Sequence, residues 1–192
     1  MIRVAVAALL AAAIGVLALA FHWAAPAPSV TGPSVAGPSP ALAGTDAAWL
    51  SLTIAMNDST LVLLDRAAPR LTDNGLATFV STLAVTHRAE LADLRARADR
   101  AHLPITDEHA GHELPGIVTP ADLARIEALP GAEFDARVRE CLREHLEQGA
   151  RLAVSEQLNG VDEATRQLAA GIERARRADL ARLGSARASA WA

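Results

Sequence analysis

The sequence predicts an all-α protein: a four-helix bundle from two repeated helical hairpins with a long crossover, after an N-terminal apolar anchor. Three observations lead to this class. Alanine, leucine and arginine dominate the chain and aromatic residues make up only 3%, a composition that favours helix over sheet. From Asp46 onward the apolar positions recur with a helical period. The second half of the chain also matches the pattern of the first half.

Two stretches that lie 89 residues apart share helix starts, caps and apolar positions. Asp46 corresponds to Asp135, Asp73 corresponds to Asp162, and the segment RAELADL at 88–94 corresponds to RADLARL at 177–183. Agreement in register across several elements indicates an internal repeat. A single hairpin exposes an apolar face, so the two hairpins are expected to bury these faces against each other.

Residues 1–24 have the pattern of a targeting segment. Arg3 precedes an uncharged apolar run at 4–21, which as a helix spans about 27 Å, close to the ~30 Å hydrocarbon core of a bilayer. This length favours a transmembrane anchor, while Ala18-Leu19-Ala20 would suit a cleaved signal peptide. Either alternative puts the domain outside the cytoplasm, anchored at the cell membrane or secreted. Residues 25–45, rich in Pro, Gly, Ser and Ala, are expected to form a flexible linker.

Cap residues and helix breakers divide the bundle domain, predicted at 46–184. Long helices are predicted at about 46–67, 74–101, 132–159 and 163–184, and a short helix opens at Thr119-Pro120. Asp73 and Asp162 are expected to cap the second and fourth long helices. Residues 185–192 are predicted to be a frayed tail.

Charge and motifs exclude several classes of function. The net charge of −4 and the pI of about 5.8 argue against a nucleic-acid partner. No phosphate-binding loop, nucleophile elbow or HExxH motif is present, so the chain is predicted not to be an enzyme and has no predicted catalytic residue. Cys141 precludes an internal disulfide because it is the single cysteine. Its position one turn before His145 permits a thiolate nucleophile, although a cysteine there is more often a small buried hydrophobe.

The first set of candidate metal ligands lies on the apolar stripes of the predicted helices. Met56, His87 and His145 occur near the middle of three helices, and Glu90 lies one turn beyond His87. Such side chains on facing helices can bind a metal. Thioether with imidazole favours Cu(I), whereas imidazole with carboxylate suits zinc or iron. The alternative is that they are ordinary hydrogen-bonded or space-filling core residues, and Arg176 in the same layer would repel a cation.

The second set lies in the crossover. His109 and His112 are three residues apart and flanked by carboxylates, so they can chelate Zn²⁺ or Cu²⁺ from a loop. A solvated polar loop is the alternative, since no second ligand pair has the diagnostic spacing. The arginine-rich run at 174–177 is predicted to be a solvated helix face. The sequence thus names copper or zinc as the candidate cofactor and leaves any protein partner unknown.

Three segments follow a known family pattern: Phe134-Asp135, LREHLEQGARLA at 142–153, and the His87-x-x-Glu90 segment with its counterpart at 176–183. On these segments the chain resembles, over about 46–183, the family called domain of unknown function 305 (DUF305). It implies an exported or membrane-anchored, ferritin-like four-helix bundle with a link to copper binding. His145 falls on one histidine of the family's paired-histidine segment, and Met56 is the equivalent position in the first copy. Most of the family's methionines are leucine here.

The predicted function is therefore an extracytoplasmic ferritin-like binding module, with copper as the candidate ligand and a depleted ligand set. The alternative function is a ligand-free structural or protein-interaction module of the cell envelope.

Overall fold

The computed structural model describes residues 42, 44–106 and 114–188, and these residues form five α-helices. Within these ranges no strand occurs, so the all-α prediction is confirmed. The helices are α1 (Gly44–Ala67), α2 (Asn74–Arg100), α3 (Pro120–Glu127), α4 (Gly131–Asn159) and α5 (Glu163–Ala188). The predicted anchor at 1–24, nearly all of the linker, and both crossover histidines, His109 and His112, lie outside the described residues.

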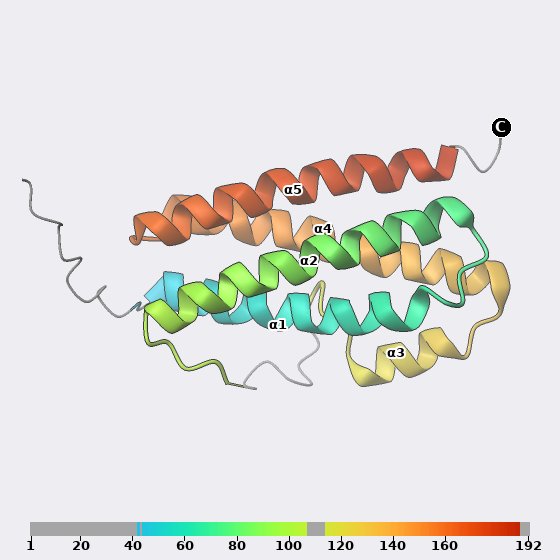
Figure 1. The fold of residues 1–192 in the computed structure, drawn as a ribbon, viewed down its shortest axis with the longest axis horizontal. Helices are drawn as coiled ribbons and strands as arrows, with labels where there is room; N and C mark the ends of the chain where they lie inside the picture. Colours follow the sequence, from blue (N-terminus) through green and yellow to red (C-terminus); the bar gives the residue numbers. More distant parts are fainter. Residues whose placement is uncertain (1–41, 43, 107–113, 189–192) are drawn as a thin grey trace, which may run out of the picture. The chain divides into compact units, whose positions relative to one another are not determined.

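The four long helices pack as two antiparallel hairpins. In the first hairpin α1 packs against α2, and in the second α4 packs against α5. Contacts of α1 with α4 and of α2 with α5 join the hairpins, and the short α3 packs on α4. Figure 1 shows the four long helices lying lengthwise beside one another. The ferritin-like classification of this bundle stays a prediction.

The predicted cap residues begin three of the helices. The Asp73 carboxylate accepts the Leu76 N–H at 2.9 Å at the start of α2. At the start of α5 the Asp162 carboxylate accepts the Thr165 N–H at 2.7 Å. Thr119 opens α3 with a capping box. The cap positions predicted from the sequence are therefore confirmed.

The end of the last helix differs from the prediction. α5 continues to Ala188, past the predicted end at 184. Gly184 does not stop it, because a single glycine only weakens a helix, and the following residues are serine, alanine and arginine without a proline. The predicted frayed tail is therefore wrong for 185–188.

Each hairpin turn is held by an aspartate from the other hairpin. The Asp135 carboxylate accepts the backbone N–H of Thr72, at 3.1 and 3.2 Å from its two oxygens, and that of Asp73 at 2.8 Å. In the second turn, the Asp46 carboxylate likewise accepts the N–H of Val161 and that of Asp162 at 3.0 Å. Donors and acceptors are related by the same 89-residue offset, which is the arrangement that an internal repeat predicts. The turns thus fasten the two hairpins to each other.

The apolar core consists of two clusters separated along the bundle axis. One contains Leu63, Leu83, Phe134 and Leu142, and the other contains Trp49, Leu50, Leu94 and Ile172. The side chains between the two clusters are polar but buried. This interruption of the core places several buried polar and ionisable groups in one layer at mid-length, and this layer is the candidate site.

Helix α1 is the one helix in the described part of the chain that is long and apolar enough to cross a membrane. Most of that helix is buried inside the bundle. Its apolar character is therefore explained by its place in the core, as for other core helices.

Candidate functional site

A layer of buried polar side chains crosses the middle of the bundle. We define the polar layer as Asn57 and Thr60 from α1, His87 and Glu90 from α2, His145 from α4, and Arg176 from α5. Five of these six side chains are fully buried, with at most 2% exposure, and Glu90 is nearly so. Because buried polar groups without hydrogen bonds are costly, the bonds within the layer decide what it can do.

Two imidazole rings meet in the centre of the polar layer. The Nε2 atoms of His87 and His145 are 3.0 Å apart, and the ring centroids are separated by 5.1 Å. The Nδ1 atom of His145 lies 2.8 Å from the Thr60 hydroxyl and 3.2 Å from the Gly116 carbonyl oxygen. The structure therefore brings together two of the histidines predicted as ligands.

The hydrogen-bond partners assign the protons on the two rings. A carbonyl oxygen can only accept, so the Nδ1 atom of His145 carries the proton and its Nε2 atom is bare. His87 must then donate from Nε2 to the bare nitrogen of His145. This leaves His87 Nδ1 without a hydrogen-bond partner of normal geometry among the described residues, although the Leu83 backbone lies near enough to interact with it.

Both histidines are held in the neutral form. Burial lowers the pKa of His87 far below its ordinary value, and the charges of Arg176 and His145 add to the effect. Burial also lowers the pKa of His145 to about 3, with the Arg176 charge as the second cause. The desolvation of a cation explains the common direction. At neutral pH the pair therefore has no charge and one proton on each ring.

The charged members of the polar layer pair with each other. The Arg176 guanidinium binds both carboxylate oxygens of Glu90, one of them at 3.0 Å. Asn57 bridges the pair: its Nδ2 donates to Glu90 at 3.0 Å and its Oδ1 accepts from Arg176 at 3.2 Å. The prediction of a solvated arginine face is wrong for Arg176, which is only 2% exposed. Its neighbour Ala175, which the helical period of apolar positions predicts to be buried, is exposed. The carboxylate of Glu90, a predicted metal ligand, is bound by Arg176.

Two glycines leave room for side chains in and beside the polar layer. A Cβ atom on Gly149 would lie 3.0 Å from the Arg176 Nε, so the absent side chain makes room for the guanidinium. Gly116 has φ +82°, and a Cβ there would lie 2.9 Å from the methyl carbon of Met56. Met56 is thus buried beside the loop whose carbonyl holds His145, on the Nδ1 side of that ring.

The donor set decides which metal the polar layer could accept. Across the described residues no group of three or more His, Cys, Asp or Glu side chains is arranged to hold a metal. Zinc and iron sites need three or more such ligands, so the residues present do not fit them. Two neutral imidazole nitrogens that face each other match Cu(I) in number and kind, but their 3.0 Å separation is a hydrogen-bond distance, so the rings would have to move apart to admit an ion with metal–nitrogen bonds of about 2 Å. His109 and His112 are not described, so the loop prediction remains untested.

Sequence reasoning missed Asn57 and Thr60. The two residues follow Met56 by one and four positions, so they lie near the stripe that was recognised. Polar residues beside a buried stripe on facing helices are the signal that could have found them. Thr60 and Asn57 belong to the site because they complete the hydrogen bonds of His145 and Arg176, respectively.

Cys141 lies one turn from His145 but does not join it. Burial raises the pKa of its thiol to about 11. A thiolate is the reactive form of cysteine, so this environment disfavours a nucleophilic role.

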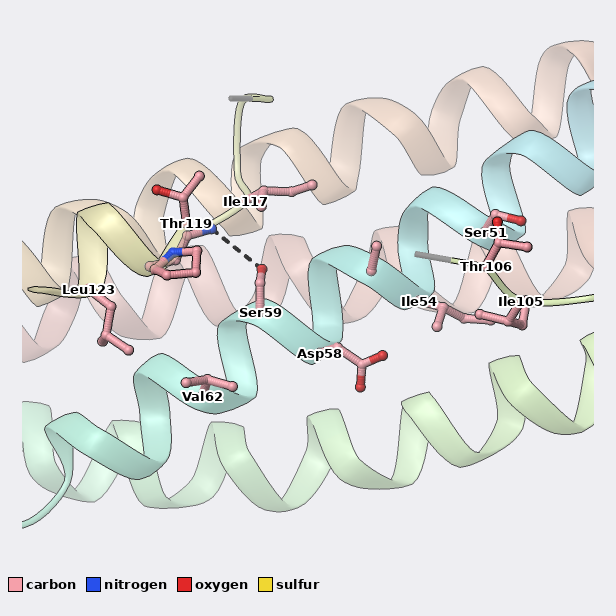
Figure 2. Close-up of a pocket in the computed structure, with 13 residues that line it drawn as sticks. Ser51, Ile54, Asp58, Ser59, Val62, Ile105, Thr106, Ile117, Thr119 and Leu123 are labelled. Carbon is pink, nitrogen blue, oxygen red and sulfur yellow. Dashed lines mark hydrogen bonds between the residues drawn. The ribbon is translucent and has the colours of Figure 1, made fainter. Parts of the chain in front are cut away.

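An apolar groove lies outside the polar layer, between α1 and the segments at 105–106 and 117–123. Its volume is about 420 Å³, and its walls include Ile54, Val62, Ile105 and Leu123. Figure 2 shows these side chains around the groove and the hydrogen bond from the Val118 N–H to the Ser59 hydroxyl. Most of its wall is aliphatic, so it suits an apolar group better than an ion.

The fold and this site define a class: an all-α bundle of two mutually capped hairpins with a buried histidine pair and a buried ion pair at mid-length. The family described as "Domain of unknown function (DUF305)" has a sequence model that matches residues 96–187. The resemblance inferred from the sequence is therefore confirmed over these residues, where the chain is similar to DUF305. The match is shorter than the predicted span of 46–183.

Two crystal structures have a similar fold. The DUF305 fragment from Deinococcus radiodurans shares 14% identity with a TM-score of 0.67, and the match covers 76% of this chain and 97% of that one. For the "putative secreted protein DUF305" from Streptomyces coelicolor the identity is 16% and the TM-score 0.64, with 73% of this chain and 90% of that one covered. At these identities the likeness establishes the fold alone. Among curated proteins, none matches the chain.

Proposed function

We propose that this protein is an extracytoplasmic, non-enzymatic binding module whose polar layer binds one Cu(I) ion between His87 and His145. The observation that carries the proposal is the pair of Nε2 atoms 3.0 Å apart, both on neutral rings. One of these atoms already has a free lone pair, because the Gly116 carbonyl holds the proton of His145 on Nδ1. Holding the second nitrogen in this way is how proteins orient metal-binding imidazoles.

Binding requires one proton to move. The proton that His87 donates from Nε2 would transfer to its own Nδ1, where the Leu83 backbone of the preceding turn provides an acceptor. Both Nε2 atoms then offer lone pairs. The charge of Arg176 disfavours any cation here, but Glu90 neutralises it within the same layer. Neutral imidazoles are borderline ligands that suit copper and disfavour hard ions such as Mg²⁺ and Ca²⁺.

The test is a Cu(I) titration of the full chain under anaerobic conditions, in competition with a chromophoric Cu(I) chelator. His87→Gln and His145→Gln are each expected to abolish binding. His102→Asn is the matched control, since His102 is exposed and its φ of 52° is tolerated by asparagine. If binding is lost instead in a His109→Ala, His112→Ala variant, the copper site is assigned to the crossover loop. Equal affinity in wild type and both glutamine variants would exclude the polar layer.

A second candidate function is a ligand-free structural or interaction module of the envelope. One observation favours it: in the described residues Glu90 and Arg176 already fill the layer with an ion pair that Asn57 bridges. A buried polar network can specify packing without any ligand. This function predicts that the glutamine variants change stability and leave copper retention unchanged.

The extracytoplasmic part of the proposal rests on the apolar run at 4–21 and on the secreted description of the Streptomyces coelicolor protein. Cell fractionation with the mass of the mature protein tests it. A full-length mass in the membrane fraction supports an anchor, a mass shortened after about residue 20 supports a cleaved signal, and a cytoplasmic full-length protein contradicts both.

The non-enzymatic part is supported by the Cys141 thiol, whose raised pKa disfavours a nucleophile. Rapid reaction of Cys141 in the folded protein with a mild thiol reagent would contradict it.

A further inference from the structure

Glu156 is a fully buried carboxyl group at the end of α4, and no part of the polar layer contacts it. Its exposure is 0%, and neither carboxylate oxygen has a hydrogen-bond donor among the described residues. Its side chain lies against the backbone of Gly160, where a Cβ atom would come within 2.3 Å of Oε1. The glycine therefore leaves space for this carboxyl group in the turn between α4 and α5.

The group that faces Glu156 is another carboxylate. Burial tends to raise the pKa of Asp46, but the N–H groups of Asp162 and Val161 and the contact with Glu156 outweigh it, so the pKa lies below its ordinary value. Asp46 is therefore ionised, and it is the neighbouring group that raises the pKa of Glu156 most. Two ionised carboxylates have no donor between them, whereas a protonated Glu156 supplies the missing one.

We propose that Glu156 is held as a neutral acid that donates its proton to Asp46, and that this proton latches the α4–α5 turn onto the start of α1. We call Asp46, Glu156 and the turn at 160–162 the carboxyl corner. Loss of the proton puts two negative charges side by side in a buried place, and the corner loosens. The device is a pH-sensitive latch at one end of the bundle, independent of the proposed copper site because the two share no residue.

The other charged groups around the carboxyl corner do not neutralise Glu156. From α2, Arg97 lies 2.6 Å from the Asp162 carboxylate and also donates to Thr165. From α5, Arg166 pairs with the exposed Glu163 and only weakly favours an ionised Glu156. Asp162 and Asp46 both oppose that ionisation. Arg97 is thus engaged by Asp162. The Nε of Arg166 is buried without a hydrogen-bond partner, and the charge of Arg166 lowers the pKa of Glu156 less than Asp46 and Asp162 raise it.

The pH range follows from the direction of the shift. Burial, followed by the contact with Asp46, raises the pKa of Glu156 from 4.5 to about 7. The latched state therefore keeps a proton that the open state releases. Its contribution is complete below the ordinary pKa and is lost as the pH rises through about 7. The histidine pair cannot cause this loss, because its pKa values are lowered.

The experiment is amide hydrogen exchange of the full chain at pH 6 and pH 8.5, corrected for the intrinsic pH dependence. The amides of Val161 and Asp162 report the latch. Those of Thr72 and Asp73 are the internal control, because they bind Asp135 in the same way and that turn has alanine at the position equivalent to Glu156. In wild type the protection of the first pair should fall roughly tenfold, as one proton linked between the two pKa values requires, and the control pair should not change.

Glu156→Gln provides a permanent donor of the same shape, so its Val161 and Asp162 amides should stay equally protected at both pH values. The carboxyl ¹³C resonance of Glu156 in the wild type tests the latch without any variant, and it should titrate near pH 7. The proposal would be overturned if the Glu156 carboxyl titrated below pH 5. It would also be overturned if the Thr72 and Asp73 amides lost protection equally, or if the glutamine variant lost as much protection as the wild type.

Discussion

The polar layer and the carboxyl corner both bury ionisable groups, but they do so in opposite ways. In the layer, each charge has a partner: Arg176 binds Glu90, and the two histidines are neutral and bonded to each other. At the corner, Glu156 faces Asp46, a group of the same charge, and Arg97 is engaged by Asp162. Burial disfavours the charged form in both places. It lowers the pKa of the histidines and raises that of the glutamate, so the comparison predicts one acid-sensitive and one alkali-sensitive region.

The largest effect is expected where a paired charge loses its partner. Arg176→Met leaves Glu90 nearly buried and unpaired, which should lower the free energy of unfolding by about 3–5 kcal/mol. Urea denaturation at pH 7 measures it. Arg95→Met is the matched control, because its ion pair with Asp58 is exposed and worth at most about 1 kcal/mol. Equal losses in the two variants would show that burial of the pair does not matter.

Acid should destabilise the protein through the histidines of the polar layer. His145 is neutral in the folded state down to a pKa of about 3, whereas unfolded histidine accepts a proton near 6.5. The unfolded state therefore binds more protons between these values, and stability falls as the pH drops from 6.5 toward 3. Urea midpoints at pH 7 and pH 4 should differ much less in a His87→Leu, His145→Leu variant than in wild type. An unchanged difference would assign the acid sensitivity to other groups.

A side chain that fills the space beside Glu156 should destabilise the carboxyl corner. Gly160 has φ −67°, which any residue adopts, so Gly160→Ala tests space and not backbone strain. The added methyl group meets the Glu156 carboxyl and also the backbone carbonyl oxygen of Glu156, 2.7 Å away, and a loss of about 1–3 kcal/mol is expected, as for other overpacked sites. In a Glu156→Ala background the clash with the carboxyl is absent and the one with the backbone oxygen remains, so the same change should cost less. Additive losses in this double-mutant cycle would mean that the two groups do not interact.

The smallest effect compares the two aspartates that fasten the turns. Asp46→Asn and Asp135→Asn each weaken hydrogen bonds to two backbone N–H groups, at a cost of about 1 kcal/mol. Only Asp46→Asn should also reduce the alkaline loss of stability, because only Asp46 faces a buried glutamate; the part caused by burial of Glu156 should remain. Denaturation at pH 6 and pH 8.5 separates the two variants. An alkaline loss of the same size in both variants would show that Asp46 does not contribute to it.

Local signals in the sequence were enough for the helices and their order. Asp73, Thr119 and Asp162 cap their helices as predicted, because a cap depends on residues only two or three positions away. The end of α5 was misplaced because Gly184 is only a weak break.

The site was less predictable because it depends on pairing across the bundle. His87 and His145 could be placed near one level of the bundle, but not in contact. Arg176 was read as part of a solvated run, since its partner Glu90 lies 86 positions away on another helix. Glu156 was overlooked because a glutamate near a helix end is usually exposed. In each case the missing information was the distance between residues far apart in the sequence.

The polar residues of α1 also affect how this chain would be exported. α1 is long and apolar enough to pass for a membrane span, and in the proposed route it follows an apolar run that directs the chain to the membrane. A translocation channel tests each such segment against lipid before the bundle can fold, and a central acidic residue opposes insertion by roughly 2.5–3.5 kcal/mol. Asp58, with Asn57 and Thr60 beside it, lies near the middle of α1. These side chains would let the helix pass through the channel and leave the apolar run at 4–21 as the favoured membrane segment.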